Sequence, residues 1–231
     1  YCWGDNGVGQ LGLGSTPALT TTATLVPGAP PGALQVETSY QATCVRTATD
    51  VYCWGANNWF FNHSVIGRAD MGPALLPVRV DLGAATADQL ALGVAHACAR
   101  LSTGGLMCWG LNSAGQLGLG DATDTHQTPT TIGGLTDVLD VCAGALFTCA
   151  VVSSGAVLCW GDDTFGQLGR GATSTVAQTV PAPSLVLSGA TGVVCGYRHA
   201  CAVRTAGAGT ELLCWGSNVQ GEVGVTASAN E

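Results

Sequence analysis

The sequence contains no lysine, and its seven basic residues are all arginines, spread along 231 residues. Fifteen acidic residues leave a formal net charge of −8 at pH 7. A nucleic-acid-binding surface needs a basic stripe to meet the phosphates, so this balance argues against a nucleic-acid partner. Only 10% of the residues are charged whereas 47% are apolar, which is the reverse of a disordered composition. The chain is therefore expected to fold around a core.

Long apolar runs and helical periodicity are also missing. No stretch approaches the roughly 18 consecutive apolar residues of a membrane span, so no membrane insertion is expected. No apolar pattern repeats with the period of about 3.6 residues that marks an amphipathic helix. No signal peptide is visible, since residue 1 already lies inside a repeated motif. The missing helical periodicity favours an all-β fold.

Glycine is abundant, with 34 residues, and the chain repeats itself. The triplet Cys-Trp-Gly begins at residues 2, 53, 108, 159 and 214, so that successive steps are 51, 55, 51 and 55 residues. Most triplets lead into a related tail that ends in Gln-Leu-Gly, as at Gln10-Leu11-Gly12, or in a close variant of it. Short strands in repeats of about 50 residues, joined by glycine-rich loops, predict the blades of a β-propeller.

A second cysteine precedes each of the last four triplets, by 9, 10, 10 and 13 residues, with a polar or glycine-containing turn in between. Short apolar strands flank each turn, which predicts a β-hairpin repeated four times. Directly opposed residues of antiparallel strands have Cα atoms roughly 4.5 Å apart, within disulfide range. Free buried cysteines in a reducing compartment are the alternative. The predicted cross-strand disulfides are Cys44–Cys53, Cys98–Cys108, Cys149–Cys159 and Cys201–Cys214.

Three further cysteines, Cys2, Cys142 and Cys195, fall outside these pairs. Cys142 and Cys195 are expected on the inner strands of adjacent blades, and a bridge between them is one hypothesis. A one-residue offset in their positions argues against it, because successive strand residues point to opposite faces. Cys2 is a triplet cysteine without a hairpin partner. Eleven cysteines favour a secreted or cell-envelope location, and none shows zinc-knuckle spacing, so no metal site is predicted.

The whole pattern resembles the regulator-of-chromosome-condensation repeat in its cysteine-bearing bacterial variety. The residues that carry the resemblance are the hairpin cysteine followed by Ala, the Cys-Trp-Gly triplet and the Gly-Gln-Leu-Gly tail. The resemblance implies a β-propeller with blades of four antiparallel strands, most often seven of them. Residues 1–231 hold about four to five blades' worth of sequence. We interpret them as a single propeller domain, or as a segment of a larger propeller that further sequence or another copy completes.

The repeated residues have simple expected roles. Each triplet tryptophan is expected in a blade core, and the glycines around Gln-Leu are expected at positive φ. His96 and His199 precede their hairpin cysteines by two residues, where Ala42 and Phe147 stand in other repeats. A metal site would need histidine in neighbouring repeats, so these are interpreted as core or channel histidines. One plant photoreceptor family that this fold resembles senses ultraviolet light through interface tryptophans outside the repeat pattern. Only Trp59 lies outside the pattern here, so photoreception is not the expected role.

The second repeat departs from the pattern. After its triplet come Trp59, Phe60 and Phe61 in place of the Gly-Gln-Leu tail. Exposed tryptophan and other aromatic side chains often dominate protein–protein binding energy. These three residues are therefore the candidate binding loop, and the alternative is that they fill space in a remodelled blade.

No nucleophile–base pair or recurrent carboxylate set is evident, so no catalytic residue and no cofactor is predicted. The expected function is a non-enzymatic, extracellular or cell-surface protein-interaction module, with a protein or a second copy as partner. One alternative is a self-assembling subunit of a surface fibre, joined through an open sheet edge. Another is a guanine-nucleotide exchange factor-like regulator, which the resemblance implies. The last is an inhibitor of a secreted enzyme. Absence of lysine with much Ala, Gly and Thr favours a bacterial source.

Overall fold

The structure is a computed structural model that describes residues 1–17, 19–57, 65–70, 72–123, 125–184, 188–207 and 209–225. These residues form strands and turns, and no helix long and apolar enough to cross a membrane occurs among them. The strands are β1 (Cys2–Asp5), β2 (Leu19–Thr24), β3 (Gln35–Thr38), β4 (Ala42–Arg46), β5 (Val51–Gly55), β6 (Ala74–Val80), β7 (Ala87–Leu92), β8 (His96–Leu101), β9 (Leu106–Leu111), β10 (Thr125–Thr131), β11 (Val138–Ala143), β12 (Phe147–Val152), β13 (Val157–Asp163), β14 (Ser174–Pro183), β15 (Ala190–Cys195), β16 (His199–Ala206) and β17 (Gly209–Gly216).

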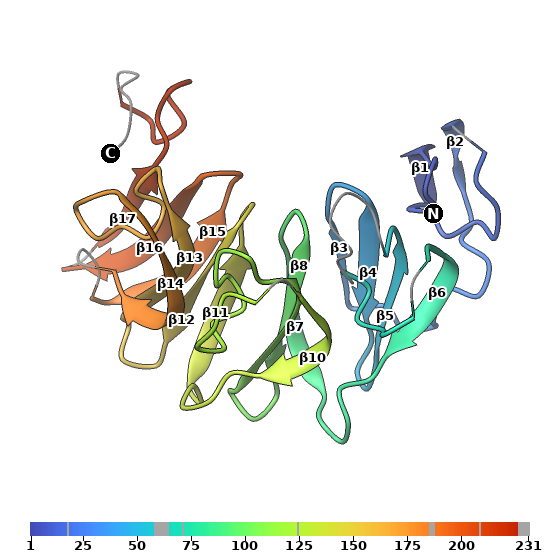
Figure 1. The fold of residues 1–231 in the computed structure, drawn as a ribbon, viewed down its shortest axis with the longest axis horizontal. Helices are drawn as coiled ribbons and strands as arrows, with labels where there is room; N and C mark the ends of the chain where they lie inside the picture. The colour runs from blue at the N-terminus through green and yellow to red at the C-terminus, as the bar shows by residue number, and fades with distance from the viewer. Residues whose placement is uncertain are drawn as a thin grey trace.

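Each repeat folds into its own antiparallel sheet. Three sheets have four strands each, β3–β6, β7–β10 and β11–β14, whereas β15–β17 form a three-stranded sheet and β1–β2 a two-stranded one. The sheets stand side by side along an open arc, with the first and last sheets at its two ends (Figure 1). This is the all-β blade architecture of a propeller, as the sequence predicts.

The position of a strand within its blade determines how deeply the strand is buried. The first strands, β3, β7, β11 and β15, contact the neighbouring blades along the inner edge. The second and third strands form the predicted hairpin, and the fourth strand lies at the outer edge. Every residue of β12 is buried, whereas β14 has only half-buried and exposed residues. The core therefore lies between adjacent sheets and thins out toward the rim.

The triplet tryptophans join each blade to the preceding one. Trp54, Trp109, Trp160 and Trp215 are buried, as predicted. The indole N–H of Trp160 donates to the carbonyl of Gln116 at 2.9 Å, although 44 residues separate them. Trp109 and Trp215 make equivalent bonds to Val65 and Gln167. Trp3 departs from the prediction, with 64% of its surface exposed.

The tail glycines have positive φ, as predicted, and one of them lies against the next tryptophan. A Cβ on Gly118 would lie 2.8 Å from Nε1 of Trp160, so only glycine lets the tail approach the indole this closely. Positive φ values are found at Gly9, Gly12, Gly115, Gly118, Gly166, Gly169, Gly221 and Gly224.

The second repeat does keep a tail, which corrects the expectation that it had lost one. Val65-Ile66-Gly67 takes the place of Gln-Leu-Gly, since the Val65 carbonyl accepts the Trp109 indole N–H at 2.8 Å. Gly67 has a φ of +74° and approaches the same indole. The tail begins eleven residues after Trp54 instead of the usual seven, so a four-residue insertion displaced it in the sequence.

Candidate interaction face

Four cysteine pairs tie together the hairpin of each blade. Their Cα atoms lie 4.0–4.2 Å apart, because each pair occupies directly opposed positions on the second and third strands. In the first three pairs both residues are fully buried. The structure thus gives these residues a scaffold role rather than a chemical one. The pairs are Cys44–Cys53, Cys98–Cys108, Cys149–Cys159 and Cys201–Cys214.

A fifth disulfide joins two blades. Cys142 of β11 is bonded to Cys195 of β15, with Cα atoms 5.4 Å apart. Cys142 lies opposite Cys149, whereas Cys195 lies opposite Ala200, one position further along its strand. The argument against this bridge was therefore wrong in its geometry. One face of a blade packs on the opposite face of the next, so the one-residue offset turns the two sulfurs toward each other.

A hollow of about 630 Å³ lies at the inner edge of the blades, where first and second strands connect. Tyr40 and Tyr197 lie in the turns that border it in the second and last sheets, with 76% and 61% of their surfaces exposed. Small and apolar residues make up the rest of the lining, and none of the described residues that line it is charged. The lining residues are Thr38, Ser39, Tyr40, Leu92, Gly93, Val94, Ala143, Gly144, Ala145, Cys195, Gly196 and Tyr197.

We call the hollow, together with the turns that surround it, the central face. Backbone hydrogen bonds hold these turns. The N–H of Ala145 donates to the carbonyl of Tyr197 at 3.0 Å, and that of Val94 donates to Gly144 at 3.3 Å. Each bond connects turns of adjacent blades. The central face is therefore a surface contributed by several repeats, whose turns are joined by hydrogen bonds between blades.

Each glycine that opens a turn on this face leaves room for a ring three residues later. A Cβ on Gly144 would lie 2.0 Å from Cε1 of Phe147, and the rings of His96 and His199 crowd Gly93 and Gly196 in the same way. In the second blade the equivalent residues are Ser39 and Ala42, a pair without a ring. The chain thus places glycine in this turn only where the ring requires it.

His96 is a neutral core histidine, in agreement with its interpretation from sequence. Its Nε2 lies 2.9 Å from Oγ1 of Thr148, whose single proton is donated to the Gln116 carbonyl at 2.8 Å. Thr148 must therefore accept, and His96 must carry its proton on Nε2. Its Nδ1 is buried without a partner among the described residues. Burial lowers the pKa of His96 to about 4, because the imidazolium would be desolvated.

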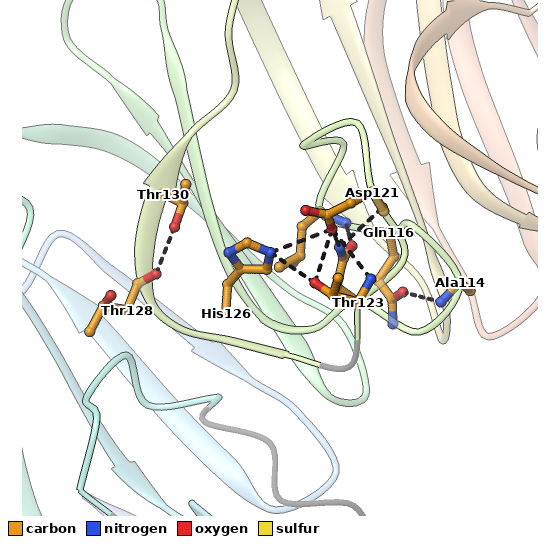
Figure 2. A network of polar contacts seen from close by, with 9 residues as sticks. Ala114, Gln116, Asp121, Thr123, His126, Thr128 and Thr130 are labelled. Carbon is orange, nitrogen blue, oxygen red and sulfur yellow. Dashed lines mark hydrogen bonds and ion pairs between the residues drawn. The ribbon is translucent and has the colours of Figure 1, made fainter.

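Hydrogen bonds within the third tail loop hold Asn112 and Asp121 in place. Asn112 accepts the Leu117 N–H at 3.0 Å and donates to the Asp121 carbonyl at 3.1 Å. The Asp121 carboxylate accepts from Thr123 and faces His126 at 3.5 Å (Figure 2). Burial acts to raise the pKa of Asp121, but the hydrogen bonds from Thr123 and the nearby His126 outweigh it and lower the pKa. The contacts of Asp121 described here are therefore all with residues of its own loop and the strand that follows it.

Other site predictions have different outcomes. Trp59, Phe60 and Phe61, the candidate binding loop, lie outside the described residues, so that loop stays a prediction. Cys2 is half-buried and unbonded, and burial raises the pKa of its thiol. Among the described residues no group of three or more His, Cys, Asp or Glu side chains is arranged to hold a metal ion. The sequence did not single out the central face, although Tyr40 and Tyr197 occupy equivalent turn positions.

Comparisons with known families agree with the repeat pattern. A family model for the regulator of chromosome condensation (RCC1) repeat matches residues 103–151 and 154–203. A second model of the same description matches residues 87–116, 138–167 and 190–222. Together the two models span residues 87–222, which is more than half of the chain.

Relatives and solved structures extend this similarity over nearly the whole chain. The ultraviolet-B receptor UVR8 of Arabidopsis thaliana is 29% identical over 99% of this chain and 51% of its own length. The probable E3 ubiquitin-protein ligase HERC4 of Homo sapiens is 28% identical over 83% of this chain and 18% of its own length. This chain thus spans about half or less of these relatives.

Two solved structures share the fold. Human WBSCR16 superposes with a TM-score of 0.82 at 21% identity, over 98% of this chain and 59% of the other. Yeast RCC1 (Prp20), solved with Kap60 bound to it, superposes with a TM-score of 0.79 at 22% identity, over 93% of this chain and 51% of the other.

Proposed function

Because the chain belongs to the regulator of chromosome condensation repeat family, we propose that it is a non-enzymatic protein-interaction module acting outside the cell or at its surface. The central face carries this proposal. Its two exposed tyrosines, Tyr40 and Tyr197, flank a shallow uncharged hollow on a scaffold of several blades. Tyrosine offers a large rigid contact area together with a polar tip, which suits it to protein interfaces.

The disulfides support the location outside the cytosol. Ten of the eleven cysteines are paired, and one pair links two blades. Structural disulfides persist in secreted and envelope proteins, whereas cytosolic thiols are generally kept reduced. A protein partner is also in keeping with the yeast relative of this fold that was solved with Kap60 bound.

Site-specific photocrosslinking tests the proposal. p-Benzoylphenylalanine would replace Tyr197 in cells that naturally make the protein, and Ser154 would be replaced as the control. Ser154 lies exposed in the turn at the other end of β12, away from the central face. A discrete adduct with a second protein from position 197, and none from position 154, is expected. Adducts from both positions alike, or from neither, would contradict the proposal.

A self-assembling subunit is the second candidate, and exposed apolar residues on the last sheet favour it. Val194 occupies the strand position equivalent to Cys142, which in β11 contacts the next blade. Val194 and Leu212 keep 65% and 68% of their surfaces exposed. Sedimentation velocity at several concentrations separates the candidates. A mass that grows with concentration, and that Val194→Asp abolishes, supports self-assembly, whereas a constant monomer mass rejects it.

A further inference from the structure

Arg198 lies beside the central face in an unusual environment. It follows Tyr197 in the turn between β15 and β16. Its guanidinium carbon lies 4.2 Å from the ring centroid of Phe165 and 5.3 Å from that of Tyr197. Phe165 belongs to the tail loop of the preceding blade, so the two aromatic rings come from different repeats. Such stacking holds a guanidinium in place while leaving its N–H groups available.

The other six arginines all have polar side-chain partners, whereas the guanidinium of Arg198 has no ion pair or hydrogen bond with the described residues. Arg198 is thus an uncompensated cation in a chain whose net charge is −8. The paired arginines are Arg46 with Gln35, Arg68 with Asp70, Arg79 with Asp50, Arg100 with Asp88, Arg170 with Gln178 and Arg204 with Glu211.

The backbone around Arg198 is fixed from two sides. Its own carbonyl accepts the N–H of Ser217 at 2.9 Å, and the carbonyl of Tyr197 accepts the N–H of Ala145 at 3.0 Å. A turn held in this way, with the side chain stacked on two rings, leaves little conformational entropy to lose on binding.

Asp162, three residues before Phe165 in the same tail loop, already accepts hydrogen bonds. Asp162 accepts hydrogen bonds from Thr164 at one oxygen and from Gln167 at the other, the latter at 2.7 Å. The turns of the other blades place Gln41, Ala95 and Leu146 at the position of Arg198. The positive charge is therefore confined to one point at the edge of an uncharged hollow.

We propose that Arg198, held against the rings of Phe165 and Tyr197, is the docking point for an Asp or Glu side chain of the partner protein. The guanidinium presents parallel N–H groups that match a carboxylate, and apolar residues next to that carboxylate pack into the hollow beside Val94 and Ala145. A single carboxylate on an otherwise apolar segment fits this surface, since the charge is single and its surroundings are uncharged. The inference rests on the function proposed above and adds the chemistry of the partner.

Peptide binding to the intact, oxidised chain tests this inference. The probes are acetylated, amidated peptides Gly-Leu-Xaa-Val-Gly, in which Xaa is Glu, Gln or phosphoserine, together with Gly-Leu-Val carrying a free carboxyl terminus. Binding is followed by NMR through the Nε–Hε signal of Arg198. The Glu peptide is expected to bind about tenfold more tightly than the Gln peptide, as one charge-assisted hydrogen-bonded pair predicts.

Variants show whether Arg198 causes the preference. Arg198→Gln should remove the preference for Glu, and Arg198→Lys should retain only part of it, since lysine keeps the charge but not the planar fork. Arg204→Gln is the matched control, because Arg204 is paired with Glu211. The inference is overturned if Glu and Gln peptides bind alike or if Arg204→Gln has the same effect as Arg198→Gln. It is equally overturned if phosphoserine or a free carboxyl terminus binds more tightly than Glu.

Failure of this inference and failure of the proposed function give different results. The crosslink from position 197 would be repeated in the Arg198→Gln background. Loss of the adduct supports docking through Arg198. An adduct of unchanged yield keeps the interaction function and rejects the carboxylate contact. Absence of any adduct even with Arg198 present rejects the interaction function itself.

Discussion

Cys142 and Cys195 form a disulfide between the inner strands of adjacent blades, although 53 residues separate them in the sequence. The other four disulfides close loops of 9 to 13 residues within a single hairpin. Cys195 also lines the central hollow. The bridge therefore fixes the spacing of two blades at the surface proposed to bind a partner.

Removing this bridge is expected to destabilise the protein more than removing a hairpin bridge. The chain-entropy relation gives about 4 kcal/mol for a loop of this length and about 3 kcal/mol for the short ones. Denaturant unfolding of Cys142→Ala/Cys195→Ala checks this, with Cys2→Ser as a neutral control. Peptide mapping without reductant should find ten bonded cysteines and one free thiol at Cys2. An unchanged midpoint, or free thiols at positions 142 and 195, would show that the bridge does not form.

Stability should fall in mild acid through His96. The pKa of this buried residue is about 4 in the folded chain, against about 6.5 when unfolded, so the unfolded state binds the proton first. Its contribution is complete above about pH 6.5 and is lost progressively as the pH falls toward 4, by about 3 kcal/mol. His96→Phe should flatten this part of the pH dependence, because Phe147 fills the same position in the next blade. Identical pH profiles for the two proteins would contradict the assignment.

Replacing Asp163 by asparagine should stabilise the protein at neutral pH. Asp163 accepts the Leu168 N–H where other repeats use Asn6 or Asn112, and burial raises the pKa of its carboxyl. Asparagine can accept the same bond and donate another, a net gain of about 1 kcal/mol. The gain should be present at pH 7, where the aspartate is ionised, and should vanish in acid, where it is protonated. Thermal unfolding at both pH values tests this. A stabilisation that did not change with pH would point to another cause.

Gly144→Ala is expected to destabilise the fourth sheet, β11–β14. The added methyl group would meet the ring of Phe147, and overpacking of this kind typically costs about 1–3 kcal/mol. Gly133→Ala is the matched control, since nothing lies within 4 Å of its Cβ position. Thermal unfolding of the two variants should therefore diverge. Equal melting temperatures would mean that the ring moves aside freely.

Local pattern was enough to predict the blades. The Cys-Trp-Gly period, the hairpin turns and the cysteine spacing all act within one repeat, so the sequence determined the all-β propeller architecture and indicated which cysteines oppose each other within each hairpin. Tail glycines at positive φ and buried tryptophans followed from the same reasoning, since each depends on backbone conformation and side-chain size.

The contacts between blades were decided only by the tertiary structure. The Cys142–Cys195 bridge depends on opposite sheet faces meeting, and the displaced tail at Val65 is recognised only by its bond to Trp109. Arg198 likewise looks ordinary in the sequence until the fold places Phe165 of another repeat over its guanidinium. A repeat pattern contains the residues that each blade needs for its own folding. Which side chains face each other across a blade junction depends on packing between residues about 50 positions apart or in neighbouring loops, and that packing exists only in the folded chain.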